Sequence, residues 1–161
     1  ELRGIFGRDA DEPLPDFSVF PPSIAEFESP PGTYYDVFAL MVMTESAFSA
    51  LEAALPESNV DVLRFRPSLV VDTENDGADA TTPGHPEFDW TGRRATIGSA
   101  VIEFGAPCPR CVMVTRKINE SVPVDRAVLR HIVRDLDQNL GVYATIVQPG
   151  VARVGDPVSF M

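Results

Sequence analysis

The pattern of apolar and polar positions predicts short strands interrupted by two helices. Residues 34–43 are rich in aromatic and β-favouring side chains and are expected to form a buried strand. Thr44 can then cap a helix, which runs until Pro56 stops it. Residues 62–72 are predicted to form the next strand, in which Pro67 requires an edge or bulge position.

The second half of the chain carries more strand signals and one strong helix signal. Asp125 can cap a helix, and Gly141 can end it in a left-handed conformation. The apolar side chains expected on one face of that helix are Val128, Leu129, Ile132, Val133, Leu136 and Leu140. The predicted strands, separated by Gly or Pro, are 95–97, 100–105, 111–115, 142–147, 152–154 and 158–160. Short strands outnumber helices, which favours a mainly β fold, a barrel with two peripheral helices.

The first 33 residues differ in composition from the rest. They hold six of the 15 prolines, several acidic residues and spaced phenylalanines. This composition is typical of an extended arm whose aromatic side chains pack on a folded domain. We expect two parts, an arm over residues 1–33 and one domain over residues 34–161. The chain begins at Glu1 without Met, from which we expect that it was excised from a longer protein.

The net charge, the apolar stretches and the cysteine content exclude several classes of protein. The chain has 13 Lys and Arg against 24 Asp and Glu, a net charge of −11, which argues against general binding of nucleic acid or of anionic membranes. The longest strongly apolar stretch, 37–43, is far shorter than the roughly 20 residues that span a bilayer, so a cytoplasmic location is expected. Two cysteines cannot form a disulfide framework.

Those two cysteines lie in the run Cys-Pro-Arg-Cys at 108–111, which admits several interpretations. A dithiol redox pair would require a helix to follow, whereas a strand is expected here. A zinc half-site would require His85 and His131, neither of which has finger-like spacing. One thiolate can instead bind a soft transition metal beside Arg110. Small core residues remain the alternative for both cysteines.

Two further groups of charged residues are candidates for chemistry. If residues 62–72 form a strand, Arg64 and Arg66 share a face and offer a fork of donors to a phosphate or carboxylate, with pairing to nearby aspartates as the alternative. Glu87 and Asp89, beside Trp90, are either a carboxylate pair for acid–base work or part of a solvated loop. The common nucleotide, zinc-protease and hydrolase motifs are absent from the sequence.

Taken in chain order, these segments resemble the MOSC domain family, the C-terminal domain of molybdenum-cofactor sulfurase. The segments that carry the resemblance are Arg64-Phe65-Arg66-Pro67, Glu87-Phe88-Asp89-Trp90, Arg110-Cys111 and the closing run Gly141-Val142-Tyr143, Pro149-Gly150 and Val154-Gly155-Asp156-Pro157-Val158. The resemblance implies a β-barrel and relatives that reduce N-hydroxylated compounds, among them the mitochondrial amidoxime reducing component.

The resemblance also implies roles for individual residues. Cys111 takes the position of the cysteine that coordinates molybdenum or handles sulfur in the family. The resemblance and the donor fork together predict cofactor binding by Arg64, Arg66, Ser68 and Arg110. Asp89, or Glu87, is then a candidate proton relay.

The implied partners are a pterin cofactor, molybdopterin, and an electron-donor or cofactor-delivery protein, because the chain has no flavin, haem or iron–sulfur motif. The alternative function is a non-catalytic module that carries sulfur as a Cys111 persulfide.

The chain departs from the family pattern at several positions. Ser68 stands where members commonly have Asn, and Met41 and Ala47 stand where members often have His and Ser. These differences remove polar groups from the region of the expected cofactor site. The N-terminal barrel that precedes the domain in the reductases has no counterpart in this sequence, where only the proline-rich arm comes before it.

Overall fold

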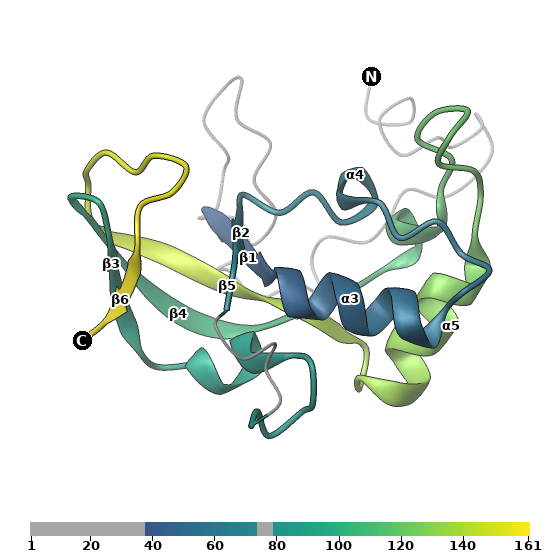
Figure 1. The fold of residues 1–161 in the computed structure, drawn as a ribbon, viewed down its shortest axis with the longest axis horizontal. Coiled ribbons are helices and arrows are strands. Elements are labelled where there is room, and N and C mark those ends of the chain that lie inside the picture. The colour runs from purple at the N-terminus through teal and green to yellow at the C-terminus, as the bar shows by residue number, and fades with distance from the viewer. Residues whose placement is uncertain (1–37, 74–78) are drawn as a thin grey trace, which may run out of the picture. The chain divides into compact units, whose positions relative to one another are not determined.

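The computed structural model describes residues 38–73 and 79–161. The predicted arm and the beginning of the predicted first strand lie outside the described residues. The described part forms one curled six-stranded sheet, a half-barrel, with two substantial helices (Figure 1). The strands are β1 (Leu40–Thr44), β2 (Leu69–Val71), β3 (Arg94–Ile97), β4 (Ala100–Pro109), β5 (Asn139–Gln148) and β6 (Val158–Phe160). The helices are α3 (Glu45–Ala54), α4 (Val62–Phe65) and α5 (Arg126–Asp135), with 3₁₀ turns η2 (Pro86–Trp90) and η3 (Val112–Thr115). The expected fold class, mainly β with two peripheral helices, is confirmed.

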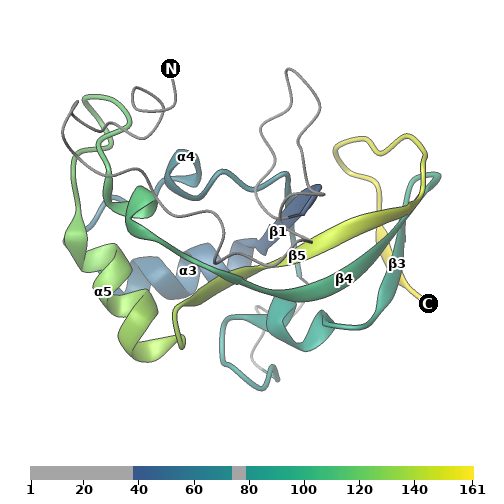
Figure 2. The ribbon, with the colours of Figure 1, turned by 180° about the vertical axis from the view of Figure 1, so that it is seen from behind.

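The strand order in the sheet is β2-β1-β5-β4-β3-β6. The pairing of β1 with β2 is parallel, and every other pairing is antiparallel. The two 10-residue strands, β4 and β5, run side by side through the length of the sheet (Figure 2). Their ladder contains register shifts, and such bulges increase the twist of a sheet and let it curl.

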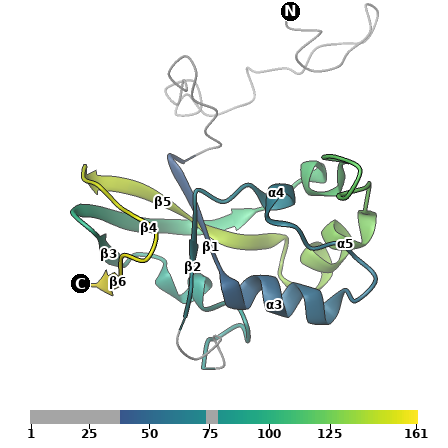
Figure 3. The same cartoon turned by 45° about the horizontal axis from the view of Figure 1, so that its top comes forward.

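Each face of the sheet carries its own hydrophobic core. Along β1, Met41 and Met43 point to one face and Val42 to the other, as the period of two in a strand requires. The first core contains the apolar faces of α3 and α5, which lie at the same end of the sheet (Figure 3). The second core gathers Trp90 and Phe104 at the end where β3 and β6 pair. The sheet therefore separates two environments.

Both long helices begin where the sequence predicts. The Thr44 hydroxyl accepts a hydrogen bond from the backbone N–H of Ala47 at 3.1 Å, and Asp125 caps α5 in the same way. The end of α5 was expected at Gly141, but the helix stops at Asp135. Asp137 and Gln138 both adopt left-handed backbone conformations there, so Leu140 and Gly141 belong to β5. Val133 is also 49% exposed rather than part of the core face.

Residues 62–65 form helix α4, whereas a strand was expected. Asp61 accepts a hydrogen bond from the N–H of Leu63 at 2.8 Å and so nucleates one helical turn. Arg66 ends that turn with φ of 56°, and β2 begins only at Leu69. The predicted alternation of Arg64 and Arg66 on one strand face is therefore wrong.

Two other predicted strands are also absent. Residues 112–115 form η3, because β4 stops pairing at Pro109 and the Thr115 hydroxyl donates to the carbonyl of Val112 at 2.8 Å, closing a turn. Residues 152–154 belong to the loop between β5 and β6. No helix among the described residues has the length and apolar character of a membrane span.

Candidate functional site

The end of β4 is fixed by Arg110. The backbone N–H of Arg110 donates to the carbonyl of Gln138 at 2.8 Å. Its guanidinium is 7% exposed and donates to the carbonyl of Phe65 at 2.7 Å and to Cys108 Sγ at 3.1 Å. These bonds join the end of β4, the residue before β5 and α4 at one place, so Arg110 determines how Cys111, the next residue, leaves the sheet.

Arg64 fastens α4 to the segment that follows Cys111. Its side chain is buried, and its guanidinium donates to the carbonyls of Val114 and Pro123, each at 3.0 Å. Longer bonds of 3.3 Å reach the carbonyls of Asn59 and Arg116. Because these donors are directed at backbone acceptors, Arg64 holds the framework of the site, and the donor fork expected from a strand does not form.

Cys111 and Arg66 are the exposed members of this framework. Cys111 is exposed, whereas Cys108 is completely buried in the first core. Arg66 follows Phe65, whose carbonyl binds Arg110, and Cys111 follows Arg110 itself. The fold thus brings the two chain segments together although they are about 45 residues apart. An exposed thiol and an exposed guanidinium extend from one buried hydrogen-bond network.

Ser68 connects α4 to the sheet. Its N–H donates to the carbonyl of Met41 at 2.7 Å, and its hydroxyl accepts from the N–H of Met41 at 3.2 Å. The serine side chain therefore extends the parallel ladder between β1 and β2 by one bond. Met41 and Ala47, the other departures from the family pattern, are buried in the first core.

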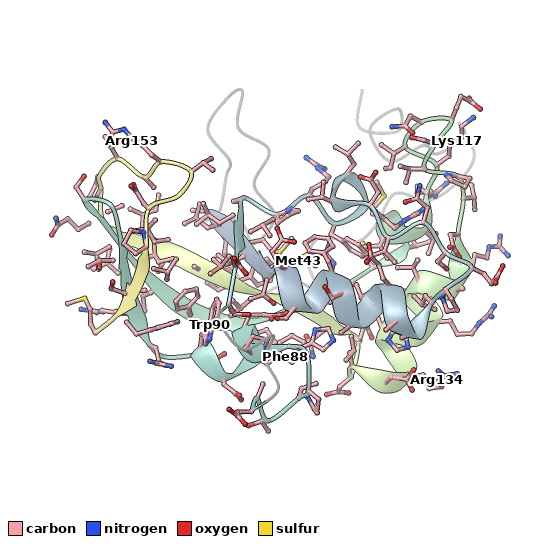
Figure 4. The ribbon with its side chains drawn as sticks, in the orientation of Figure 1. Met43, Phe88, Trp90, Lys117, Arg134 and Arg153 are labelled. Carbon is pink, nitrogen blue, oxygen red and sulfur yellow. The ribbon has the colours of Figure 1, made fainter. Side chains whose placement is uncertain are left out.

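The two acidic residues beside Trp90 do not form a carboxylate pair. Asp89 is exposed and accepts a hydrogen bond from the N–H of Thr81 at 2.8 Å. η2 packs against β1, β4 and β5, whereas η3, next to Cys111, packs against α4 and α5. Figure 4 shows Phe88 and Trp90 of η2 well separated from Lys117, which lies shortly after η3. The structure does not bring Asp89 to Cys111.

Glu87 belongs to a buried polar cluster that the sequence did not reveal. It is fully buried, and one carboxylate oxygen accepts a hydrogen bond from the Thr44 hydroxyl at 2.8 Å. Nδ1 of His85 lies 3.5 Å from the other oxygen. The only signal in the sequence was a polar residue at a helix cap, which gave no indication of a partner 43 residues away.

Neither histidine supports the zinc interpretation. His85 lies against Glu87, and His131 Nδ1 lies 2.6 Å from Asp135 Oδ2, one turn along α5. Across residues 38–73 and 79–161, no three His, Cys, Asp or Glu side chains gather in a way that would hold a metal ion. Cys111 is therefore a single soft donor beside cationic and hydrogen-bonding groups.

Among curated proteins, the chain is similar in sequence to amidoxime reducing components. The amidoxime-reducing component 1 of Xenopus laevis mitochondria is 30% identical over 137 residues, which covers 78% of this chain and 37% of that protein. The human mitochondrial amidoxime reducing component 2 is 28% identical, with 78% and 38% covered. The chain spans about two fifths of the length of these relatives.

Solved structures with a similar fold include YiiM from Geobacillus stearothermophilus, with a TM-score of 0.54 and 15% identity, covering 77% of this chain and 54% of that one. YiiM from Escherichia coli is similar, with a TM-score of 0.53 and the same coverage. The family model of the MOSC domain matches residues 31–159, which is most of the sequence. The chain therefore belongs to the MOSC domain family.

Proposed function

We propose that this domain binds a molybdenum cofactor at the surface formed by Cys111 and Arg66, and that it serves a reductase of N-hydroxylated compounds. The observation that carries the proposal is the exposure of Cys111 directly after the buried, hydrogen-bonded Arg110. The relatives named amidoxime reducing components support the same chemistry.

The residues present fit such a group. A thiolate is a suitable ligand for a soft transition metal, and Cys111 is accessible. Nε of Arg110 is a buried donor without a hydrogen-bond partner in the part of the chain that the structure describes. A buried donor of this kind is costly unless a partner satisfies it, and an anionic oxygen of a pterin cofactor would do so.

In the proposed mechanism each side chain has one task. The Cys111 thiolate would hold the metal, and Arg66 and Arg110 would hold anionic oxygens, while Arg64 and Ser68 keep α4 and β2 in place. The cofactor would supply the two-electron chemistry that breaks an N–O bond. Reduction of an N-hydroxyl group consumes two electrons and two protons and releases water, and the electrons would come from an electron-donor protein. Asp89 as a catalytic proton relay stays a prediction, which its position on η2 does not favour.

The test compares the two cysteines. The wild-type chain and the variants Cys111→Ser and Cys108→Ala are purified from a host that makes molybdenum cofactor, and molybdenum and pterin are measured per chain. We expect at least about tenfold less molybdenum in Cys111→Ser, because the hydroxyl is a poor soft ligand, and a clearly smaller loss in Cys108→Ala, which removes only one acceptor of the Arg110 guanidinium. Equal molybdenum in wild type and Cys111→Ser would refute the proposal.

A second function is favoured by the same exposed thiol. Cys111 is also accessible to the persulfide of a sulfur-donor protein: its thiolate would take the outer sulfane sulfur, the donor would leave as a thiol, and the domain would be a sulfur carrier. Intact-protein mass spectrometry distinguishes the two functions, because the carrier would gain one sulfur atom at Cys111 and contain no metal.

Arg66 allows stability to be separated from cofactor binding. It has φ of 56° and precedes Pro67, a backbone conformation that is unfavourable for a residue with a Cβ. We expect Arg66→Gly to raise the free energy of unfolding by about 1 kcal/mol. The same substitution is expected to lower the pterin content, because the guanidinium is lost. Urea denaturation and pterin analysis of one preparation measure both effects, and unchanged pterin would remove Arg66 from the proposed site.

A further inference from the structure

A groove lies between α5 and η3, next to Cys111. We call it the α5–η3 groove, and it encloses about 460 Å³. Its lining residues are Val112, Thr115, Arg126, Leu129, Arg130, Val133 and Arg134. Val112 directly follows Cys111, so the groove begins where the proposed cofactor site ends.

The walls of the groove combine apolar and cationic side chains. Val112 on η3 and Val133 on α5 both line the groove, and they are 53% and 49% exposed. Arg126, Arg130 and Arg134 occur every fourth residue of α5, which places them on one side of the helix over about 12 Å. The opposite side of α5, with Val128 and Ile132, is buried in the first core.

Two of the three arginines have no acidic partner within residues 38–73 and 79–161. Arg134 donates to Asp135 at 2.8 Å, and this hydrogen bond lowers the pKa of Asp135 to about 2, so the pair stays ionised. Arg126 and Arg130 form no ion pair with any described residue. They are exposed cations in a chain whose net charge is −11. The groove is therefore a local positive region on a negative protein.

From this arrangement we propose that the α5–η3 groove is the docking surface for an acidic partner protein, which places carboxylates on Arg126 and Arg130 and an apolar side chain between Val112 and Val133. Cations spaced along two turns of a helix match several carboxylates better than the single charge of a small ligand. Repulsion by the remaining acidic surface would orient such a partner toward the groove.

The role of the partner rests on the proposed function, although the docking surface itself does not. A protein docked in the groove would lie next to Cys111, because Val112 lines it. Under the proposed function this is the position from which an electron donor would reach the cofactor. Binding and cofactor content can therefore be measured separately.

The experiment uses a fluorescein-labelled helical probe peptide that carries glutamates on one face and leucines on the other. A matched peptide has lysines in place of the glutamates. Fluorescence anisotropy measures binding to the full chain at low and at physiological salt. We expect Arg126→Glu/Arg130→Glu to weaken binding of the acidic peptide at least about tenfold, and added salt to weaken binding to the wild type. Val133→Ser is expected to weaken it about threefold through lost apolar contact.

Matched controls carry the same changes elsewhere. Arg93→Glu/Arg153→Glu alters the net charge equally, and Val154→Ser removes an apolar side chain from an exposed loop. Both control variants should bind the acidic peptide with the affinity of the wild type. The proposal would be overturned if Arg126→Glu/Arg130→Glu bound the acidic peptide as tightly as the wild type, or if the charge control lost as much binding. It would also be overturned if the groove bound a naphthalene sulfonate but not the peptide. The molybdenum content of Arg126→Glu/Arg130→Glu should stay at the wild-type level. A chain that binds the peptide but never binds molybdenum would refute the proposed function and leave the docking surface supported.

Discussion

Arg64→Leu is expected to lower the free energy of unfolding by about 4 kcal/mol, as measured by urea denaturation followed by circular dichroism. The guanidinium donates to four backbone carbonyls, and its removal leaves the buried carbonyl of Val114 without a partner. Each buried acceptor that loses a charged donor costs about 1–3 kcal/mol, while leucine recovers some apolar contact. The large loss follows from the convergence of three chain segments on one side chain.

The matched control is Arg66→Leu, two residues away on the exposed side of the same turn. It is expected to change the free energy of unfolding by less than about 0.5 kcal/mol, since the side chain is exposed and forms no hydrogen bond or ion pair with a described residue. Arg64→Lys should remain strongly destabilised, because an ammonium cannot reproduce the planar set of donors. If Arg64→Leu unfolds like the wild type but loses pterin, Arg64 is a ligand-binding residue after all.

Gly141→Ala is expected to lower the free energy of unfolding by about 3 kcal/mol. Gly141 has φ of 79°, which costs an alanine about 1–2 kcal/mol. A Cβ there would also lie 2.8 Å from Met41 Sδ and 2.9 Å from the carbonyl oxygen of Val42, in the middle of the sheet. Overpacking of this kind typically costs about 1–3 kcal/mol more. Thermal and urea denaturation measure the change.

Gly155→Ala separates the two contributions. Gly155 has φ of 92°, but a Cβ at this position meets nothing within 4 Å. It is expected to lose only about 1 kcal/mol from backbone strain. If both variants lose the same amount, the contact with β1 contributes nothing, and the sheet adapts to a larger residue at position 141.

Gly141 also shows why the β4–β5 ladder reaches the candidate site. Pro107 pairs with Val142 and Pro109 pairs with Asn139, so two residues of β5, Leu140 and Gly141, lie opposite Cys108 alone. This is a bulge with a glycine in the left-handed conformation. It lets the strands continue to Pro109, from which Arg110 and Cys111 extend. The stability of the sheet and the placement of the thiol thus depend on the same residue.

The local signals in the sequence predicted the elements that depend on neighbouring residues. Thr44 and Asp125 form caps because a side-chain oxygen two or three residues before an N–H needs no distant partner. The resemblance to the MOSC family likewise came from motif order. The strand predicted over residues 62–72 failed at its beginning, since β-favouring residues were overridden by the Asp61 cap and by the buried contacts of Arg64.

The sequence alone determined the fold class and the two helix starts, because these follow from periodicity and capping chemistry. The family and the candidate cysteine came from the resemblance of several motifs, in chain order, to the MOSC family. Only the tertiary structure decided that Cys111 is exposed while Cys108 is buried, and that Arg64 supports the backbone while Arg66 is exposed. It also decided that Glu87 is buried beside Thr44 while Asp89 is exposed. The physical reason is that burial and hydrogen-bond partners come from residues far away along the chain. Arg110 meets the carbonyl of Phe65 45 positions earlier, and no local pattern encodes such a contact.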